Sequence, residues 1–494
     1  MHNNAKGGAA VQLNSFAFFG FFAAVFALWW GPARRWRQPL LFAASVFFYA
    51  LFGLPAAALL LGCELFCWGA GLLLARRPSR PLLALCLALV LAPLFLFKYL
   101  AFFAGGLSAL TQAVGGAALP AVPSLLQPLG ISYTTFLMVS YLVDIYRGTL
   151  APEKNFFLCA ASLSLFLQVT AGPLTLPREL LPQLRGCPSL SFDCGGAVAG
   201  AQLVLLGLFK KIVVADALSY YTSAVYADPR RLYGLSFAVA ALFYTVQIYA
   251  DFSGYTDMAR GFAGLLGLRL APNFDAPYLS RTVKEFWGRW HISLSAWLKE
   301  YVYIPLGGNR VSRPRYYFNL FATFVLSGLW HGARLTMLCW GALHGLYQVV
   351  GAATRRPRER LRRALHIGEN AWYLRLWQTV FTFVLVSFAW IFFGAPDMAT
   401  ALTIVRALPV GFAPTLAHIK DSLVLLGLTT TAVLRFAVLF AALLGLDLAT
   451  RDIGWERWIR RQKPWVQLAL CWLLAAGLVL WGNLGGGSFM YFQF

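Results

Sequence analysis

Two histidines in one polar stretch are the side chains best suited to chemistry in this sequence. The stretch begins at Arg281 with RTVKEFWGRWHISLSAWLKEYVYIPLGGNR, which contains His291, and ends at LSGLWHGA, which contains His331. Apolar blocks flank it on both sides. An imidazole has a usual pKa of about 6.5, so at neutral pH it is unprotonated and can take a proton from a hydroxyl group. Because ionisable side chains at membrane depth are costly, they are functional candidates by default.

Composition indicates the elements that must position these histidines. Hydrophobic residues make up 59% of the chain and charged residues 12%, and the mean hydropathy is +0.65. We therefore expect an all-α, polytopic integral membrane protein with about ten to twelve membrane segments, some of them short or broken by Gly and Pro. The apolar runs are 12–31, 39–53 with 55–75, 81–104, 128–146, 156–171, 196–214, 232–250, 316–353, 372–395, 422–447 and 464–483.

Basic residues gather in short loops at 34–37, 76–80, 355–363 and 451–463. This distribution is typical of cytoplasmic loops, so positive-inside topology explains most of the formal charge of +22 without a nucleic-acid partner. Counting spans between these loops predicts that both termini are extracytoplasmic. The first apolar segment precedes its positive cluster, unlike a cleavable signal peptide, so we expect it to remain in the mature protein.

One integral-membrane domain is expected to fill residues 1–494, with N-terminal helices in 12–270, core motifs in 272–353 and C-terminal helices in 354–494. Breaks in the helices are expected at 172–177, 251–257 and 272–315, and non-helical backbone at membrane depth is tolerated where it lines a cavity. These breaks predict a protein built around a central pathway. Cysteine spacing indicates no metal site. Cys187 and Cys194 could pair in an oxidising compartment, but the sequence does not settle which side their loop faces.

An amphipathic helix is expected within the polar stretch. Its apolar stripe consists of Val283, Trp287, Trp290, Leu294, Trp297 and Tyr301, whose spacing alternates between four and three residues. The many aromatic and basic residues favour a position at the membrane interface. His291 would flank the stripe, with Ser295 one turn later. The alternative interpretation of His291 is a polar residue that holds the helix against a neighbour.

His331 lies in a different setting. Residues 317–350 are almost entirely apolar and too long for one comfortable span, so we expect two segments that meet near residues 328–332. A chain that enters, turns at depth and returns would bury His331 inside the protein. The alternative interpretation is a core histidine that bonds a backbone carbonyl.

Several motifs together resemble the membrane-bound O-acyltransferase (MBOAT) family, and in particular its bacterial alginate O-acetyltransferase branch. The strongest are PNFDAPYLSRTVKEFWGRWHISLSAWLKEYVYIPLGGNR and, about twenty residues later, LSGLWHGA. The others are PLGISYTTFLMVSYLVDIYRG at 128–148, AGPL at 171–174, GLFKKIVVADAL at 207–218, QIYADFSGYTDMARG at 247–261 and MYFQF at 490–494.

The resemblance implies an MBOAT-like helical fold with interfacial or re-entrant helices and a central pathway. It implies that an acetyl group moves from a cytoplasmic thioester such as acetyl-CoA, used as co-substrate with no bound cofactor, toward hydroxyls of an exported alginate-like polysaccharide. Extracytoplasmic acyltransferase partner proteins and a bacterial inner-membrane location are implied as well. In this family the residue that matches His331 is catalytic, and the one that matches His291 is a second important site.

Other polar residues are weaker candidates for contact with substrate: Asn309, Trp330, Ser295, Lys210 and Lys211. Turn formation is the simpler role for Asn309, and an interfacial anchor is the simpler role for the two lysines, ahead of contact with the phosphates of coenzyme A. Capping or pairing with Arg260 is the simpler role for Asp251 and Asp257. Asp144 and Asp216 are expected to be structural.

Three alternative functions remain open. D-alanyl transfer from a carrier protein to a cell-envelope polymer shares the histidine motif. A transporter or lipid flippase shares the broken helices, although the two halves of the chain show no internal symmetry. A non-catalytic scaffold for exopolysaccharide assembly would not need His331. The sequence does not select the acceptor polymer.

Overall fold

The structure is a computed structural model that describes residues 12–123, 125–411, 415–482 and 489–490. Over these residues the chain is helical without a β-strand, and one isolated antiparallel bridge joins Phe274 to Trp290. An all-helical chain is expected in lipid, where backbone groups must find their partners within their own segment. The N-terminal end of the chain and the MYFQF motif beyond Met490 lie outside the described residues.

The chain divides into two compact units. The first contains the described residues up to Leu206, Tyr255–Ala271 and residues 489–490, and the second contains Gly207–Gly254 and the described residues from Pro272 to 482. Helices of the first unit are α2 (Phe16–Trp30), α3 (Arg37–Ala50), α4 (Leu54–Arg76), α5 (Arg80–Leu94), α6 (Leu100–Ala113), α7 (Ile131–Tyr146), α8 (Phe156–Ser164), α9 (Pro177–Gly186) and most of α10 (Cys194–Leu208), with short turns η2 (Arg34–Trp36), η3 (Phe95–Tyr99) and η4 (Cys187–Ser189).

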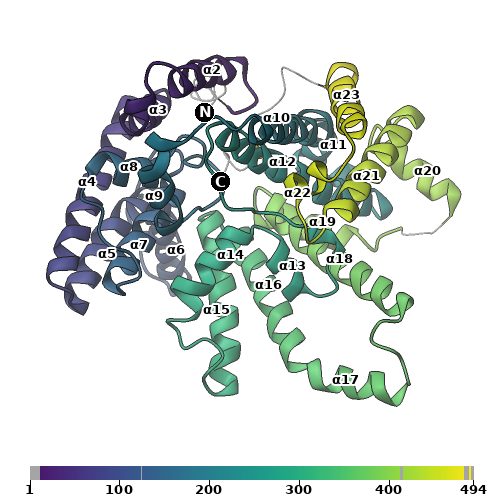
Figure 1. Cartoon of the computed structure of the whole chain (residues 1–494). Coiled ribbons are helices and arrows are strands. Elements are labelled where there is room, and N and C mark those ends of the chain that lie inside the picture. Colours follow the sequence, from purple (N-terminus) through teal and green to yellow (C-terminus); the bar gives the residue numbers. More distant parts are fainter. Residues whose placement is uncertain (1–11, 124, 412–414, 483–488, 491–494) are drawn as a thin grey trace. The chain divides into compact units, whose positions relative to one another are not determined.

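Helix α7 forms the centre of the first unit, packed against α4, α5, α8 and α9 (Figure 1). Nearly all of its residues are buried. It begins after Gly130, whose φ of +72° and whose position against the carbonyl of Val169 leave no room for a side chain. The backbone between α8 and α9 is not helical, which confirms the break expected at 172–177.

The second unit begins with the π-helical turn η5 (Phe209–Ala215). It continues with α11 (Asp216–Ala227), η6 (Pro229–Arg231), much of α12 (Leu235–Leu265), η7 (Pro277–Leu279), α13 (Val283–Arg289), α14 (Ile292–Leu298), η8 (Lys299–Tyr303), α15 (Arg313–His331), α16 (Leu335–Ala353), α17 (Arg355–Ala364), α18 (Trp372–Gly394), α19 (Met398–Ala407), α20 (Leu416–Leu425), α21 (Thr430–Thr450), α22 (Trp455–Arg460) and α23 (Pro464–Trp481).

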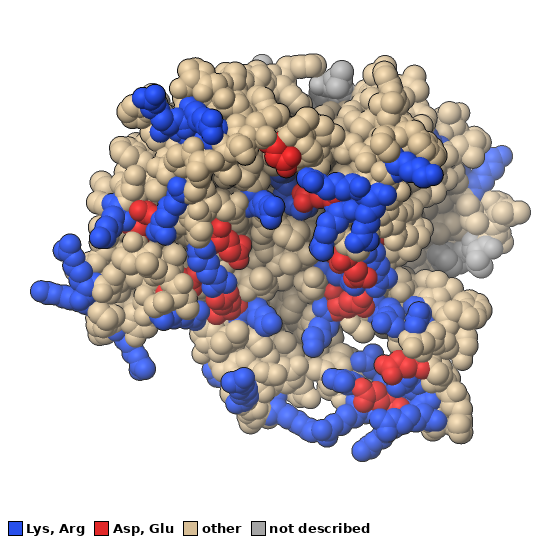
Figure 2. All heavy atoms as spheres, viewed as in Figure 1, with Lys and Arg blue, Asp and Glu red and all other residues tan. Residues whose placement is uncertain are grey.

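Helices α15 and α16 form an antiparallel pair that turns at residues 332–334 (Figure 1). This is the pair of segments that the sequence predicted for 317–350. The basic helix α17 follows it, and Figure 2 shows Lys and Arg side chains gathered over that helix. Helices α16 and α17 lead the chain from His331 to the start of α18.

The number of membrane segments can be compared with the count that the sequence predicted. Among the described residues seven helices are long and apolar enough to cross a membrane, or eight if α2 and α3, bent by 108° at their junction, form one broken span. The expected count of ten to twelve is therefore not confirmed. Helix α7, which the sequence counted as a span, is a shorter apolar helix of 16 residues and is not among these candidates.

The break expected at 251–257 is wrong. Helix α12 runs without interruption from Leu235 to Leu265. Gly254 serves close packing instead, since a Cβ atom there would lie 2.8 Å from the carbonyl oxygen of Gly207. Cys187 is buried, Cys194 is exposed, and both are free thiols.

Candidate active site

The polar stretch does not form the continuous amphipathic helix that its periodicity predicted. Helix α13 ends at Arg289 and α14 begins at Ile292. Between them Trp290 is extended and His291 has φ +44° and ψ +53°, the left-handed region that few non-glycine residues adopt. Strain of this kind persists only where surrounding contacts impose it, and it is concentrated at functional sites.

Asn273 supplies the contacts that hold this break. Its side-chain oxygen accepts hydrogen bonds from the backbone N–H of Ser293 at 3.2 Å and from the Ser293 hydroxyl at 2.5 Å. Its backbone carbonyl accepts one from Ile292 N–H at 3.0 Å. Asn273 therefore satisfies N–H groups at the start of α14 that have no partner within the helix. The position of His291 depends on this residue, which the sequence reasoning did not identify.

His291 is fully buried. Its ring packs edge-on against Phe252, with centroids 4.7 Å apart, and lies 6.0 Å from the ring of Trp330. Burial lowers the pKa of His291 to about 3, because the charged imidazolium loses its hydration. The side chain is therefore neutral at physiological pH.

His331 is the last residue of α15 and only 3% exposed. Three aromatic rings surround it, with centroids at 4.8 Å for Trp330, 5.1 Å for Trp340 and 5.3 Å for Phe393. They come from α15, α16 and α18, so the setting of the imidazole depends on all three helices. Rings this close exclude water from the imidazole.

The structure brings the two predicted histidines together. Their ring centroids are 6.4 Å apart, although they are forty positions apart in the sequence, His291 at the break between α13 and α14 and His331 at the end of α15. Trp330, a weaker sequence candidate, contacts both rings. At this separation both imidazoles can contact one small reacting group.

A third histidine, which packs against the same Trp340 ring as His331, was missed as a candidate. His344 in α16 is fully buried, and its Nδ1 accepts a hydrogen bond at 3.2 Å from the indole N–H of Trp287 in α13. This bond ties the polar stretch to the α15–α16 pair. The sequence offered one signal for His344: it lies four residues after Trp340, and residues four apart share one face of a helix.

Lys210 and Lys211 lie in the π-helical turn η5 and are both buried. The Lys211 ammonium is 2.7 Å from an oxygen of Asp216 and 2.8 Å from one of Asp251. The expectation of an interfacial anchor is wrong for Lys211, because buried charges in a membrane span require partners and its partners are these two aspartates. Phe252, which follows Asp251 in the chain, packs against His291, so the charge cluster adjoins the histidine pair.

The other two candidates differ in position. Asn309 is exposed in the turn after η8, next to Gly307 and Gly308 with positive φ, which fits a role in the turn. Ser295 is partly buried in α14; its N–H donates to the carbonyl of His291 at 3.0 Å and its hydroxyl to that of Trp290 at 3.4 Å. Ser295 thus bonds the two residues at the break between α13 and α14, whereas Asn309 lies in the later turn.

Comparison with known proteins yields one family. Residues 155–395 match the model of the membrane-bound O-acyltransferase family. This match includes the polar stretch, both histidines and the helices that surround them.

Individual relatives extend the match over most of the chain. A probable alginate O-acetylase, AlgI, of Pseudomonas putida is 34% identical over 388 residues, which cover 78% of this chain and 77% of that protein. A peptidoglycan O-acetyltransferase of Helicobacter pylori is 28% identical over 493 residues, 91% of this chain and 90% of that protein. A teichoic acid D-alanyltransferase of Streptococcus thermophilus is 28% identical over 261 residues, 49% of this chain and 60% of that protein.

Proposed function

Because this chain belongs to the membrane-bound O-acyltransferase family, we propose that it transfers an acetyl group from a thioester on the cytoplasmic side toward hydroxyls of an exported polysaccharide, with His331 as the catalytic base. The chain is an acyltransferase with several apolar helices able to cross a membrane. The identities of the donor, the acceptor and the catalytic residue are proposals. The observation that supports them is that the rings of His331 and His291 lie close together among aromatic side chains.

In the proposed reaction His331 takes the proton of the acceptor hydroxyl as the hydroxyl oxygen attacks the thioester carbonyl carbon. The new C–O bond forms, the tetrahedral intermediate expels the thiolate as the C–S bond breaks, and the proton on His331 passes to the leaving sulfur. His291 is neutral, so one of its ring nitrogens carries a proton, which can be donated to the developing oxyanion. Water exclusion by Trp330, Trp340 and Phe393 protects the thioester from hydrolysis.

The acceptor is proposed from the relatives. Alginate is a polysaccharide and peptidoglycan contains polysaccharide strands, and the proteins named for acting on them are similar to this chain over more than three quarters of its length. We propose an exported polysaccharide of this kind as the acceptor, an extracytoplasmic acyltransferase as partner and the bacterial inner membrane as location. Both termini would then be extracytoplasmic.

D-alanyl transfer from a carrier protein is the second candidate. The observation in its favour is the similarity to a teichoic acid D-alanyltransferase. That similarity covers about half of this chain, whereas the alginate relative covers 78% at higher identity. Acetyl transfer is therefore the better-supported function.

A vesicle assay tests the proposal. The purified protein is reconstituted, labelled acetyl-CoA is supplied on the face that bears α17, and thioester loss and label on the opposite face are both followed. His331→Asn is compared with His366→Asn, which changes an exposed histidine after α17. We expect His331→Asn to lower the rate about 10²- to 10⁴-fold, as for loss of a general base, and His366→Asn to match the parent.

The other outcomes separate the alternatives. Equal thioester loss by His331→Asn and parent would show that His331 is not the base. Passage of intact donor or lipid across the vesicle membrane would identify a transporter. Turnover only with a D-alanyl carrier protein, and none with acetyl-CoA, would favour the second candidate.

A further inference from the structure

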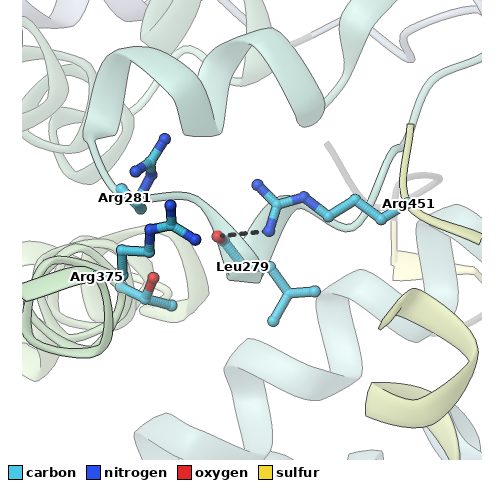
Figure 3. Close-up of a pocket in the computed structure, with 5 residues that line it drawn as sticks. Leu279, Arg281, Arg375 and Arg451 are labelled. Atoms are coloured by element: carbon cyan, nitrogen blue, oxygen red, sulfur yellow. Dashed lines mark hydrogen bonds between the residues drawn. The ribbon is translucent and has the colours of Figure 1, made fainter. Parts of the chain in front are cut away.

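A cavity of about 290 Å³ lies in the second unit, away from the histidine pair, and three arginines line it. They are Arg281 before α13, Arg375 in the first turn of α18 and Arg451 after α21; Leu279 and Thr379 complete the lining. Figure 3 shows Arg281 and Arg375 close together on one side and Arg451 extending toward them from the other. No acidic residue lines the cavity.

The charges of these arginines are only partly balanced. Arg451 lies 3.1 Å from a carboxylate oxygen of Glu285, but the same oxygen lies 3.2 Å from Arg289. The Arg375 guanidinium donates to the side-chain oxygen of Asn370, a neutral group. Among the described residues the guanidinium of Arg281 has no hydrogen bond or ion pair, and neither Arg281 nor Arg375 pairs with a carboxylate.

The nearby acidic residues are engaged mainly with Arg289. Asp275 and Asp452 bind Arg289 at 2.6 Å and 2.7 Å, and the second carboxylate oxygen of Asp452 lies 3.7 Å from Arg451. Convergent like charges repel one another unless an anion lies between them. Planar guanidinium groups match the oxygens of a phosphate particularly well, because each can donate two parallel hydrogen bonds.

The distance between the cavity and the histidines can be estimated along α18. Thr379 lines the cavity, and Phe393 of the same helix contacts His331. Fourteen residues of helix correspond to a rise of about 21 Å. A thioester donor carries its phosphate at the far end of an extended pantetheine arm, so a carbonyl at His331 would leave the phosphate well removed from the histidines.

We propose that the cavity formed by Arg281, Arg375 and Arg451 binds a phosphate group. Two sources supply this chemistry: the phosphate of the pantetheine-bearing donor, an identification that rests on the proposed function, and the phosphodiester of an anionic phospholipid. Arg375 is exposed and the other two arginines are half-buried, so the site is accessible from the surface.

The test measures binding without an acceptor, so acyl transfer is not required. Full-length protein in phosphatidylcholine vesicles is titrated with labelled acetyl-CoA and, separately, with acetyl-pantetheine, which has no phosphate. Arg281→Gln and Arg375→Gln are compared with Arg360→Gln, an exposed arginine of α17 outside the cavity. For a donor phosphate, we expect each cavity variant to bind acetyl-CoA about tenfold more weakly while its affinity for acetyl-pantetheine stays unchanged.

A second arm replaces part of the phosphatidylcholine with phosphatidylglycerol and follows thermal unfolding. For a lipid phosphate, phosphatidylglycerol raises the unfolding temperature of the parent and of Arg360→Gln but not of the two cavity variants, and acetyl-CoA affinity is unchanged. Arg281→Lys keeps the charge and is expected to retain part of the effect in either arm. If both cavity variants match Arg360→Gln in both arms, the site does not exist, whatever the vesicle assay shows for transfer.

Discussion

Gly328 of α15 and Gly341 of α16 face each other so closely that a Cβ atom added to either would lie 3.1 Å from the Cα atom of the other. Such a Cβ would also lie 2.2 Å from the carbonyl oxygen of Met337 or 2.4 Å from that of Phe324, respectively. Small residues of this kind let membrane helices approach each other closely. The contact is three residues before His331 and one residue after Trp340, so it sets the distance between the imidazole and the indole.

Gly341→Ala is therefore expected to separate α15 from α16. Overpacking of this kind costs about 1–3 kcal/mol, and the displacement should also lower activity because Trp340 moves with the backbone. Gly351→Ala in the same helix is the control, since a Cβ there meets no atom within 4 Å. Thermal unfolding in detergent should show a lower transition for Gly341→Ala and an equal or higher one for Gly351→Ala. Equal transitions would show that the pair has room for a methyl group.

Asn273→Ala is expected to release His291 from its left-handed conformation. The N–H and hydroxyl of Ser293 lose their acceptor, and each hydrogen bond lost from a buried site costs about 1–3 kcal/mol. We expect the turnover rate to fall about tenfold or more while the KM for the donor changes little, as for a positioning residue. Asn309→Ala, in an exposed turn, should match the parent. Equal rates for the two asparagine variants would contradict this role.

Lys211→Met is expected to destabilise the protein strongly. It leaves Asp216 and Asp251 buried without their cation, and removing one partner of a buried ion pair costs about 3–5 kcal/mol. The triple variant Lys211→Met, Asp216→Asn and Asp251→Asn removes all three charges and should recover much of this loss. Denaturant unfolding of the three proteins provides the measurement. A triple variant no more stable than Lys211→Met would mean that the cluster does not act through charge pairing.

Acid should weaken the folded protein at His291. The pKa of His291 is lowered to about 3 by burial, whereas an unfolded histidine titrates near 6.5, so between these values only the unfolded chain binds the proton. Stability therefore falls as the pH decreases through this window and is fully present above it. His291→Gln lacks the effect, so the unfolding temperature of the parent minus that of His291→Gln should decrease from pH 7 to pH 4. A difference independent of pH would place the pKa of the folded state near its ordinary value.

Particular residues show which features could be predicted from the sequence and which could not. His331 and its turn between two apolar segments were predictable, because the length of the run 317–350 and its polar interruption are local features. The continuous helix through His291 was predicted wrongly, because the periodicity of its apolar stripe continues across a break that Asn273 stabilises from outside the helix. The burial of α7 inside the first unit was not predictable, since composition does not distinguish lipid from protein surroundings.

By itself the sequence determined that the chain is helical, enters the membrane and belongs among acyltransferases with two histidines worth testing, because apolar length, charge distribution and ordered motifs are properties of the chain alone. Only the tertiary structure decided that His291 is buried and strained, that His344 joins the polar stretch to α16, and that Lys211 binds two aspartates. It alone brought Arg281, Arg375 and Arg451 to one cavity. Contacts between residues far apart in sequence arise from the packing of helices, which no local pattern encodes.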